Sequence, residues 1–287
     1  MSPCAAMARA SERISGSAVT NAHSLDCKVR DMNGLATFGT VAALLASGVS
    51  AAQSPAAERA PSACPASSGA TAPVIVELYT SEGCDSCPPA DRWLSRVIAD
   101  RGRDSGVIPL AFHVDYWDYI GWKDVFAQPE FARRQASLAA SGGATGVYTP
   151  QIFVNGKDDR SWTLGALQTG AGGKAATVKF SAVMRWRDGG AEVSGKLAEA
   201  APHVRLRYAV TENGLVSAVK AGENRGVTLR HDAVVRAHGL LAMDANGSFS
   251  INTVLPKALR RSASQLHVIA EDGRGNVLAA ATIACAG

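Results

Sequence analysis

The sequence predicts two folded regions in tandem, an α/β domain over residues 73–176 and an all-β, sandwich-like domain over residues 177–287. Two observations support the first region: a buried-strand run ends in a Cys-x-x-Cys pair that opens a helical pattern, and a second buried-strand run follows after a helix-length gap. The second region shows short alternating apolar runs between turn signals. With 47% hydrophobic residues, the 287-residue chain can bury a sizeable core.

The first 52 residues are predicted to be an N-terminal extension and signal peptide. Lys28 and Arg30 precede the apolar run 35–49, and small residues at 50–52 supply an Ala-x-Ala-like cleavage site. The run is too short and too rich in small residues for a membrane span, so no stable membrane insertion is expected after cleavage, with an uncleaved anchor as the alternative. The predicted location is therefore periplasmic or secreted, and the Ala/Pro/Ser-rich stretch 53–72 is predicted to be a flexible linker.

The organising motif joins a predicted strand starting at Val74 to a predicted helix through Cys84 and Cys87. A strand that ends in Cys-x-x-Cys and opens a helix is typical of a dithiol redox site. Free backbone N–H groups and the positive end of the helix dipole favour a thiolate there. Cys84 is predicted to be the attacking thiolate, as the more N-terminal and more exposed cysteine, and Cys87 to resolve the mixed disulfide.

Two cysteines remain after export and pairing of the motif. Cys64 precedes the first predicted strand, and Cys285 ends the last one. Neither has a nearby partner in the sequence, and the compartment is oxidising, so a structural Cys64–Cys285 disulfide is predicted. The alternative is that Cys64 stays free or pairs between molecules.

Further elements complete the predicted α/β domain. The run at 107–114 is predicted to be a strand parallel to the first, because a helix-length crossover separates the two runs. Asn155-Gly156 signals a type I′ hairpin. The other expected elements are a helix at 129–140, a strand at 151–154, a return strand at 158–163 and a short helix at 164–175.

This order of elements resembles the thioredoxin-like fold, and the residues that carry the resemblance are Cys84, Cys87, Thr149 and Pro150. The resemblance implies that Pro150 is cis and packs against the dithiol. Thr149 and Trp117 are predicted to bind substrate, with Trp117 in a wall beside the cleft, as core or rim. A closer similarity is to the exported bacterial family catalogued as domain of unknown function 1223. The phrases that match are residues 76–91, 111–118, 147–156 and 222–231.

Two further side chains have ambiguous roles. Glu77 lies in the middle of the first apolar strand, and the thioredoxin resemblance allows it to relay a proton to Cys87; the alternative is a carboxylate on a solvated sheet face. His113 ends the second strand, where sites of open α/β sheets lie, so that it could complete a copper site with Cys84 and Cys87. A satisfied core histidine is the alternative.

The second region is predicted to form an antiparallel sandwich from short strands. The loop 221–226 is interpreted as a solvated hairpin loop, with anion binding through Arg225 as the alternative, and His231 is not assigned to catalysis. The expected strands are 178–186, 191–197, 204–211, 216–220, 234–241, 249–252, 266–270 and 277–283.

Together these features predict an exported thiol–disulfide oxidoreductase that acts on protein cysteines through Cys84 and Cys87 by mixed-disulfide exchange. No cofactor is expected, and the partners would be protein thiols or disulfides and an unidentified redox partner. Two alternatives stay open: copper or other metal handling, and a non-catalytic binding module with a structural disulfide. The net charge of +4 is spread thinly, which argues against nucleic-acid binding.

Overall fold

A computed structural model describes residues 63–101, 106–164, 173–199, 201 and 203–285. All of them belong to one compact unit, Ala57–Gly287. The predicted signal peptide and most of the predicted helix at 164–175 lie outside the described residues. Within the described part, no helix is long and apolar enough to cross a membrane.

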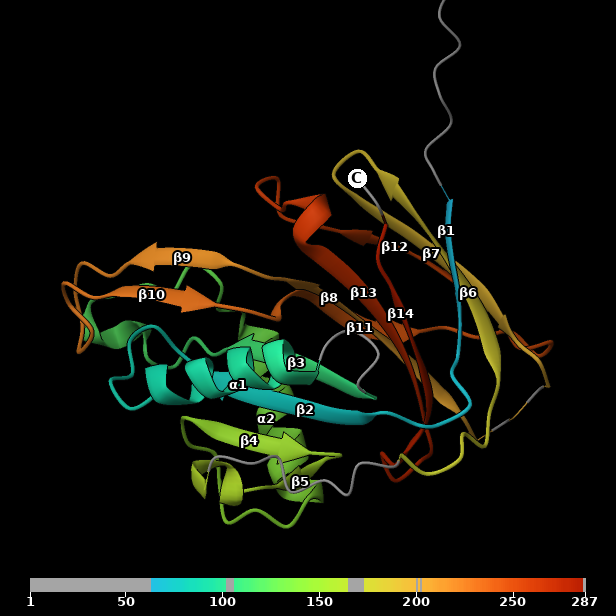
Figure 1. Ribbon diagram of the computed structural model, residues 1–287, viewed down its shortest axis with the longest axis horizontal. Helices are drawn as coiled ribbons and strands as arrows, with labels where there is room; N and C mark the ends of the chain where they lie inside the picture. Colours follow the sequence, from blue (N-terminus) through green and yellow to red (C-terminus); the bar gives the residue numbers. More distant parts are fainter. Residues whose placement is uncertain (1–62, 102–105, 165–172, 200, 202, 286–287) are drawn as a thin grey trace, which may run out of the picture. The chain divides into compact units, whose positions relative to one another are not determined.

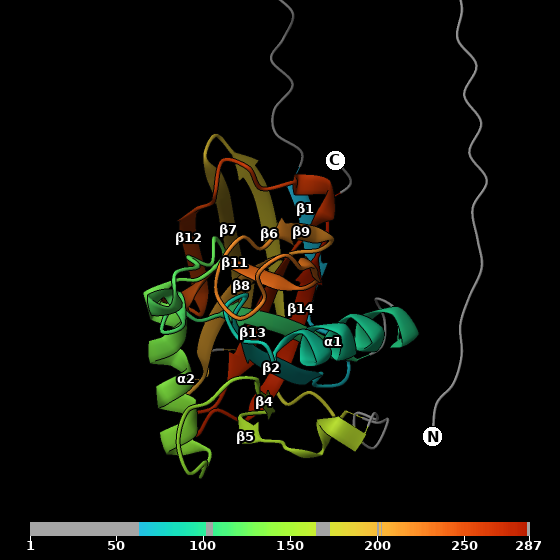
Figure 2. The same cartoon turned by 90° about the vertical axis from the view of Figure 1, so that its left-hand side faces the viewer.

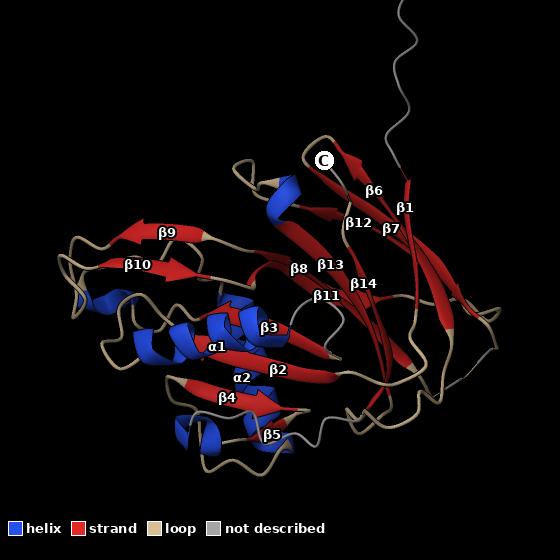
Figure 3. Ribbon diagram, viewed as in Figure 1, coloured by secondary structure: helices blue, strands red, loops and turns tan. Residues whose placement is uncertain are grey.

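Strands dominate the described residues, with fourteen strands in three sheets and two α-helices (Figure 3). The largest sheet has eight strands in the order β14-β13-β8-β11-β3-β2-β4-β5. Its strands are Val74–Thr80 (β2), Val107–His113 (β3), Gln151–Val154 (β4), Lys157–Asp158 (β5), Arg205–Glu212 (β8), Val234–Leu241 (β11), Ser264–Glu271 (β13) and Val277–Ile283 (β14).

Two smaller sheets accompany it. A four-stranded sheet has the order β1-β6-β7-β12, and β9 pairs with β10 as a two-stranded hairpin. Their strands are Ala63–Ser67 (β1), Phe180–Arg187 (β6), Gly190–Leu197 (β7), Leu215–Ala218 (β9), Thr228–His231 (β10) and Ser248–Val254 (β12). Three 3₁₀ turns complete the described elements: Asp118–Ile120, Ser161–Leu164 and Arg261–Ala263.

The two helices cover opposite faces of the β2–β3–β4 part of the large sheet (Figure 2). Helix α1, Pro88–Arg101, buries Trp93 and Leu94 against alternate residues of β2 such as Leu78. Helix α2, Pro129–Ser141, buries Phe131 on the other face, beside Tyr79 and Phe112. Because successive strand residues point to opposite faces, β2 is apolar on both sides.

A third core lies between the four-stranded sheet and the β8–β13–β14 part of the large sheet. Met184 and Val193 of the small sheet face Val268 and Ala281 of the large one within this cluster. This packing of one sheet on another is the arrangement expected of the sandwich region.

The predicted fold class, an α/β thioredoxin-like domain followed by a sandwich, is wrong, because the protein is mainly β. Strand β3 pairs in parallel with β11 through Ala111 and Val234, and the Ala111 N–H donates to the Ala233 carbonyl at 2.8 Å. This pairing gives β3 a neighbour on its second edge, so the strands on both sides of residue 176 form one sheet. The predicted domain boundaries themselves stay predictions.

Most predicted elements are confirmed. Strands β2 and β3 are parallel, α2 covers the predicted helix, and β4 has the predicted bounds. Asn155 and Gly156 both have positive φ, 48° and 77°, as a type I′ turn requires. The return strand is shorter than expected, since β5 has two residues.

One strand was missed in the stretch predicted to be a linker. Strand β1 pairs antiparallel with β6 at the edge of the four-stranded sheet. Pro65 interrupts its pattern, and proline is tolerated at an edge because it has no N–H to donate. Part of the predicted linker is therefore strand.

Candidate functional site

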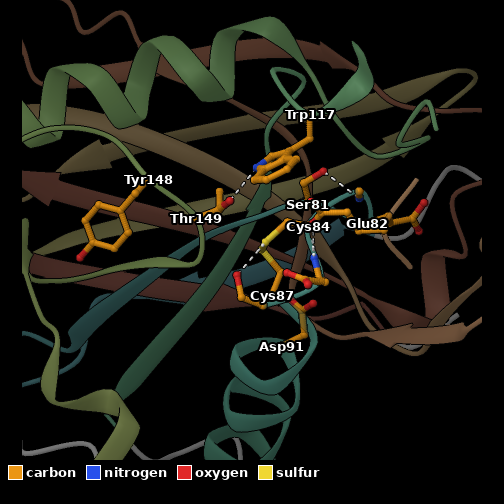
Figure 4. Close-up of a disulfide and its surroundings, with 12 residues drawn as sticks. Ser81, Glu82, Cys84, Cys87, Asp91, Trp117, Tyr148 and Thr149 are labelled. Carbon is orange, nitrogen blue, oxygen red and sulfur yellow. Dashed lines mark hydrogen bonds between the residues drawn. A yellow bond between two sulfur atoms is a disulfide. The ribbon is translucent and has the colours of Figure 1, made fainter. Parts of the chain in front are cut away.

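The turn between β2 and α1 holds a disulfide between Cys84 and Cys87 (Figure 4). Both cysteines have 0% exposure, so the greater exposure predicted for Cys84 is wrong. Helix α1 begins at Pro88, whose fixed φ suits the first helical position, and Asp91 adds a negative charge in the first turn. The strand and the helix thus place the sulfur pair at the positive end of the α1 dipole.

The free backbone N–H groups expected at this helix start are not available to the sulfurs. Pro88 and Pro89 have no N–H, and the N–H groups of Ala90 and Asp91 both donate to the Cys87 carbonyl. A side chain supplies the closest hydroxyl instead, since Ser86 Oγ lies 3.3 Å from Cys84 Sγ. Stabilisation of a Cys84 thiolate would therefore come from the dipole and from the Ser86 hydroxyl.

The loop between β9 and β10, residues 219–227, covers the dithiol turn. Asn224, which is 6% exposed, donates from Nδ2 to the carbonyls of Glu82 and Cys84 at 2.9 and 2.8 Å. Glu223 accepts the N–H of Asp85 at 3.0 Å. Strand β10 packs against α1, and Figure 1 shows the hairpin running alongside that helix. The loop closes the turn on the side where the Cys84 and Glu82 carbonyls would otherwise be open.

Five buried ionisable side chains form a cluster behind the dithiol turn. They come from the turn itself, from the start of α1, from β3, from the segment after β3 and from β10. The members, hereafter the acid–histidine cluster, are Glu82, Asp91, His113, Asp124 and His231, all at most 7% exposed. Sequence separations of up to 149 residues between members mean that the fold, and no local motif, assembles the cluster.

The contacts within the acid–histidine cluster link its members in series. His113 Nδ1 lies 2.7 Å from Asp124 Oδ2, and the two imidazoles of His113 and His231 meet edge to face with centroids 4.8 Å apart. His231 Nε2 lies 3.3 Å from Glu82 Oε1, and His231 Nδ1 lies 3.8 Å from Asp91 Oδ2. The Asp124 carboxylate also accepts the N–H of Glu82 at 2.9 Å, which ties the cluster to the turn.

The surroundings shift several of these pKa values. Burial lowers the pKa of His113, but the Asp124 carboxylate outweighs it, so the net shift is upward. Burial raises the pKa of Asp124, and the His113 imidazole reverses this to a net decrease. For Asp91, burial raises the pKa and the charges of His231 and His113 offset it only in part. The cluster thus combines a His113–Asp124 ion pair with a carboxyl, Asp91, whose pKa is raised.

Glu77, predicted as a possible proton relay, lies away from α1 on the α2 face of β2. It accepts from Arg134 Nε at 2.8 Å, from Tyr79 Oη at 2.8 Å and from Arg207 Nη2 at 3.3 Å. Burial raises its pKa, but Arg134 and Arg207 together lower the pKa to about 2. A carboxylate held ionised in this way fits an ion-pair role, and the described contacts bring it to neither sulfur.

The residues predicted for the substrate side lie beside the turn. The Thr149–Pro150 peptide bond is cis, and Trp117 Nε1 donates to Thr149 Oγ1 at 2.7 Å (Figure 4). A Cβ added at Gly83 would meet Trp117 Cβ at 3.2 Å, so the tryptophan packs directly on the turn that precedes Cys84. Trp117 and Thr149 are thus brought together beside the turn that holds the disulfide, and the packing of Pro150 against the dithiol stays a prediction.

The metal alternative needs His113 with both cysteines. In the structure, the Nδ1 atom of His113 is engaged by Asp124, and the two sulfurs are joined to each other. No group of three or more His, Cys, Asp or Glu among the described residues has a geometry suited to a metal ion. Zinc or copper ligation would therefore require a different arrangement of these side chains.

The second disulfide joins Cys64 of β1 to Cys285, which follows β14. It links residues 221 positions apart, with Cα atoms 5.6 Å from each other. Both cysteines pack against the apolar core between the two sheets. This is the pairing predicted from the sequence.

Several site residues escaped sequence reasoning. The sequence predicts a solvated loop at 221–226 and no catalytic role for His231. In the structure, Asn224 is buried against the dithiol turn and His231 lies in the acid–histidine cluster. The available signal was Asn224 between two glycines, Gly222 and Gly226, with positive φ. Such a loop can fold back on itself, but its target depends on tertiary structure.

Comparisons with known proteins agree with the sequence analysis on the family alone. The model of a family described as protein of unknown function, DUF1223, matches residues 75–271. No curated protein matches the sequence.

Two solved structures are similar to the chain. One is a crystal structure of a protein from Agrobacterium tumefaciens, with 26% identity, a TM-score of 0.48, and coverage of 73% of this chain and 93% of that one. The other is HBP35 of Porphyromonas gingivalis, with 15% identity, a TM-score of 0.49, and coverage of 75% and 76%. Because both TM-scores lie below 0.5, neither likeness says what this chain does. The family match spans most of the chain, which therefore belongs to the DUF1223 family of proteins of unknown function.

Proposed function

We propose that the protein is a thiol–disulfide oxidoreductase that exchanges disulfides with protein cysteines through Cys84 and Cys87. The observation that carries the proposal is a Cys-x-x-Cys disulfide at the start of α1, with an acid–histidine cluster directly behind it. Inert disulfides need no buried ionisable groups, and keeping five such groups out of water costs free energy. Perturbed ionisable groups gather where protons are moved.

The exchange balances as two thiolate displacements. In the reducing direction, the Cys84 thiolate attacks one sulfur of a client disulfide, forms a mixed disulfide and releases one client thiolate. Cys87 then loses its thiol proton and attacks the Cys84 sulfur, which closes the Cys84–Cys87 bond and releases the second client thiolate. Two electrons pass from the dithiol to the client, and the oxidising direction is the reverse.

The acid–histidine cluster supplies the proton acceptor for this sequence. Asp91 lies four residues after Cys87, so both side chains project from the same face at the start of α1 (Figure 4). His231 sits between Asp91 and Glu82, with a nitrogen toward each. A proton that leaves the Cys87 thiol passes to the Asp91 carboxylate. The His231 imidazole, which lies beside Asp91, stabilises the negative charge of Asp91 before the transfer and of the Cys87 thiolate after it.

Access to Cys84 requires the β9–β10 loop to move. Cys84 is fully buried, and its carbonyl is held by Asn224. A client sulfur must approach along the axis of the Cys84–Cys87 bond, which the closed loop does not permit at 0% exposure. The loop therefore opens before exchange, and the three side-chain hydrogen bonds that Asn224 and Glu223 make to the turn are a barrier small enough to allow it.

The proposed compartment is oxidising, either the periplasm or the exterior. Two disulfides within one compact unit fit such a compartment, because cytosolic thiols are kept reduced. The predicted signal peptide points the same way, although it lies outside the described residues.

The proposal is tested by reduction of insulin with dithiothreitol as the electron donor. The oxidised full chain should shorten the lag before insulin precipitates, in proportion to its concentration. A chain in which Cys84→Ser removes the nucleophile should match the rate of dithiothreitol alone. Identical rates with and without the wild-type protein would remove the proposal.

A further inference from the structure

A second concave surface lies on the α2 side of the large sheet, away from the dithiol at the start of α1. Its volume is about 730 Å³. The C-terminal half of α2 forms one wall, the β4–β5 turn and the β13–β14 turn form the rim, and β2 and β8 form the floor. A volume of this size falls in the range of small-molecule sites.

Basic side chains predominate in this groove. Five of its lining residues are basic and two are acidic, so the lining carries a formal charge of 5 − 2 = +3. Asp272 of the rim turn reduces this locally, although its carboxylate already accepts N–H groups from Arg274 and Asn276 of the same turn. The basic residues are Arg134, Lys157, Arg205, Arg207 and Arg274, and the acidic ones are Glu77 and Glu271.

The two acidic residues are already neutralised within the floor. Glu77 accepts from Arg134 and Arg207, and Glu271 accepts from Arg207 Nε at 2.8 Å. Two arginines and two carboxylates therefore form a balanced buried network. The net positive charge rests on the other three basic residues, Lys157, Arg205 and Arg274, all of them exposed at the rim.

Several donors of the groove have no strong acceptor. Arg207 is 4% exposed, lines the floor, and its Nη1 has no hydrogen-bond partner among the described residues. Arg205 reaches the carbonyls of Asp272 and Gly273 only at 3.4 and 3.3 Å. In the part of the chain that the structure describes, no hydrogen bond or close ion pair engages the ammonium group of Lys157 or the guanidinium of Arg274, although the Arg274 charge lowers the pKa of Asp272. A buried donor without an acceptor is costly, which favours a ligand that supplies one.

We propose that this groove binds a small anionic molecule whose charge is carried by phosphate or carboxylate groups. Guanidinium groups present planar pairs of N–H donors that match the oxygens of both groups. Arg205 at the start of β8 and Arg274 in the β13–β14 turn would meet a ligand from two sides, above the buried Arg207 guanidinium of the floor. The inference is independent of thiol–disulfide exchange, because it uses no residue of the dithiol site.

The test is calorimetric titration of the full oxidised chain at constant ionic strength, with pyrophosphate as the phosphate probe and citrate as the carboxylate probe. Saturable binding of either probe with one site per chain is expected, and the stronger probe identifies the group. The double variant Arg205→Ala/Arg274→Ala should weaken binding by about tenfold or more, because two exposed charged donors of the groove are lost.

A charge-matched control separates a site from general attraction. Arg225→Ala/Arg230→Ala also removes two exposed positive charges, but from the β9–β10 hairpin at the dithiol side. It should leave the affinity within about twofold of wild type, since exposed charges far from a ligand are screened by salt. The absence of saturable binding by both probes, or equal losses in the two double variants, would overturn the proposal.

Discussion

The two disulfides of this protein join very different surroundings. The Cys64–Cys285 bond joins β1 to the residue that lies just beyond β14, 221 positions along the chain, and packs against an apolar core. The Cys84–Cys87 bond spans three positions, at the start of a helix, with a buried acid–histidine cluster behind it and a loop over it. The first surroundings suit a permanent crosslink, and the second suit a bond that forms and breaks. The two cysteine pairs thus differ in their surroundings, which are apolar around Cys64–Cys285 and ionisable around Cys84–Cys87.

The largest expected effect separates the two disulfides by activity. Cys84→Ser should reduce insulin reduction to the rate of dithiothreitol alone, because no thiolate remains to attack. Cys87→Ser should trap client proteins as mixed disulfides on Cys84, detectable on non-reducing gels. The matched control, Cys64→Ser/Cys285→Ser, should retain the wild-type rate at a temperature where it is folded. Trapping by the Cys84 variant in place of the Cys87 variant would reverse the assigned roles.

The second-largest expected effect is the difference in unfolding free energy lost when each disulfide is removed. Removing the Cys64–Cys285 crosslink should lower the free energy of unfolding by up to about 5 kcal/mol, because the chain-entropy model assigns a large term to so long a loop. Removing the three-position crosslink by Cys84→Ser/Cys87→Ser should cost less, because its loop is short. Denaturant unfolding of the two double variants compares them. A larger loss from the short crosslink would contradict the assignment of roles.

A third prediction concerns the ion pair in the cluster. The raised pKa of His113 gives stabilisation that is full below its ordinary value of 6.5 and is lost as the pH rises through the folded value. The lowered pKa of Asp124 gives stabilisation that is present above 3.8 and is lost as the pH falls through the folded value. Asp124→Asn should therefore destabilise by about 2 kcal/mol between those values and by less at high pH.

Urea unfolding at several pH values measures this window. Asp85→Asn is the control, because Asp85 is an exposed carboxylate of the same turn and is not a member of the acid–histidine cluster. A destabilisation by Asp124→Asn that is the same at every pH would show that the pair contributes packing and no charge interaction.

The smallest expected effect concerns the covering loop. Asn224→Ala removes two hydrogen bonds to the dithiol turn, worth about 0.5–1.5 kcal/mol each, so the open state should become about tenfold more populated. The rate at which dithiothreitol reduces Cys84–Cys87 should rise accordingly. Arg225→Ala, an exposed neighbour in the same loop, should leave that rate unchanged. Equal rates for Asn224→Ala and wild type would mean that the loop does not limit access.

Local pattern predicted much of the fold. Residues 151–154 form a short, mostly apolar run between Pro150 and the turn signal Asn155-Gly156. The strand and its turn could therefore both be predicted. The pairing of β3 with β11 was not predictable, because Ala111 and Val234 are distant in sequence and nothing near either residue specifies the other. The fold class was predicted wrongly because this pairing, which joins the two predicted domains in one sheet, could not be foreseen.

The candidate site was predictable to the same extent. Cys84, Cys87 and Pro150 stand in recognisable local contexts, and the structure joins the two cysteines in a disulfide and makes the Thr149–Pro150 bond cis. His231 and Asn224 belong to the site through the β9–β10 hairpin, whose docking on α1 depends on the whole sheet. Glu77 shows the same limit. Its unusual place in an apolar strand is visible in the sequence, but its partners, Arg134 of α2 and Arg207 of β8, are supplied by the fold.

The most direct test of the central claim is the redox equilibrium of both disulfides in one protein. The full chain is equilibrated in glutathione and dithiothreitol buffers of defined potential, and each cysteine pair is quantified by alkylation and peptide mass. Cys84–Cys87 should titrate reversibly between about −270 and −120 mV, the range of exchange dithiols, while Cys64–Cys285 stays oxidised to below about −300 mV. A Cys84–Cys87 bond that also resists reduction below −300 mV would make it a second structural crosslink and contradict the proposed function.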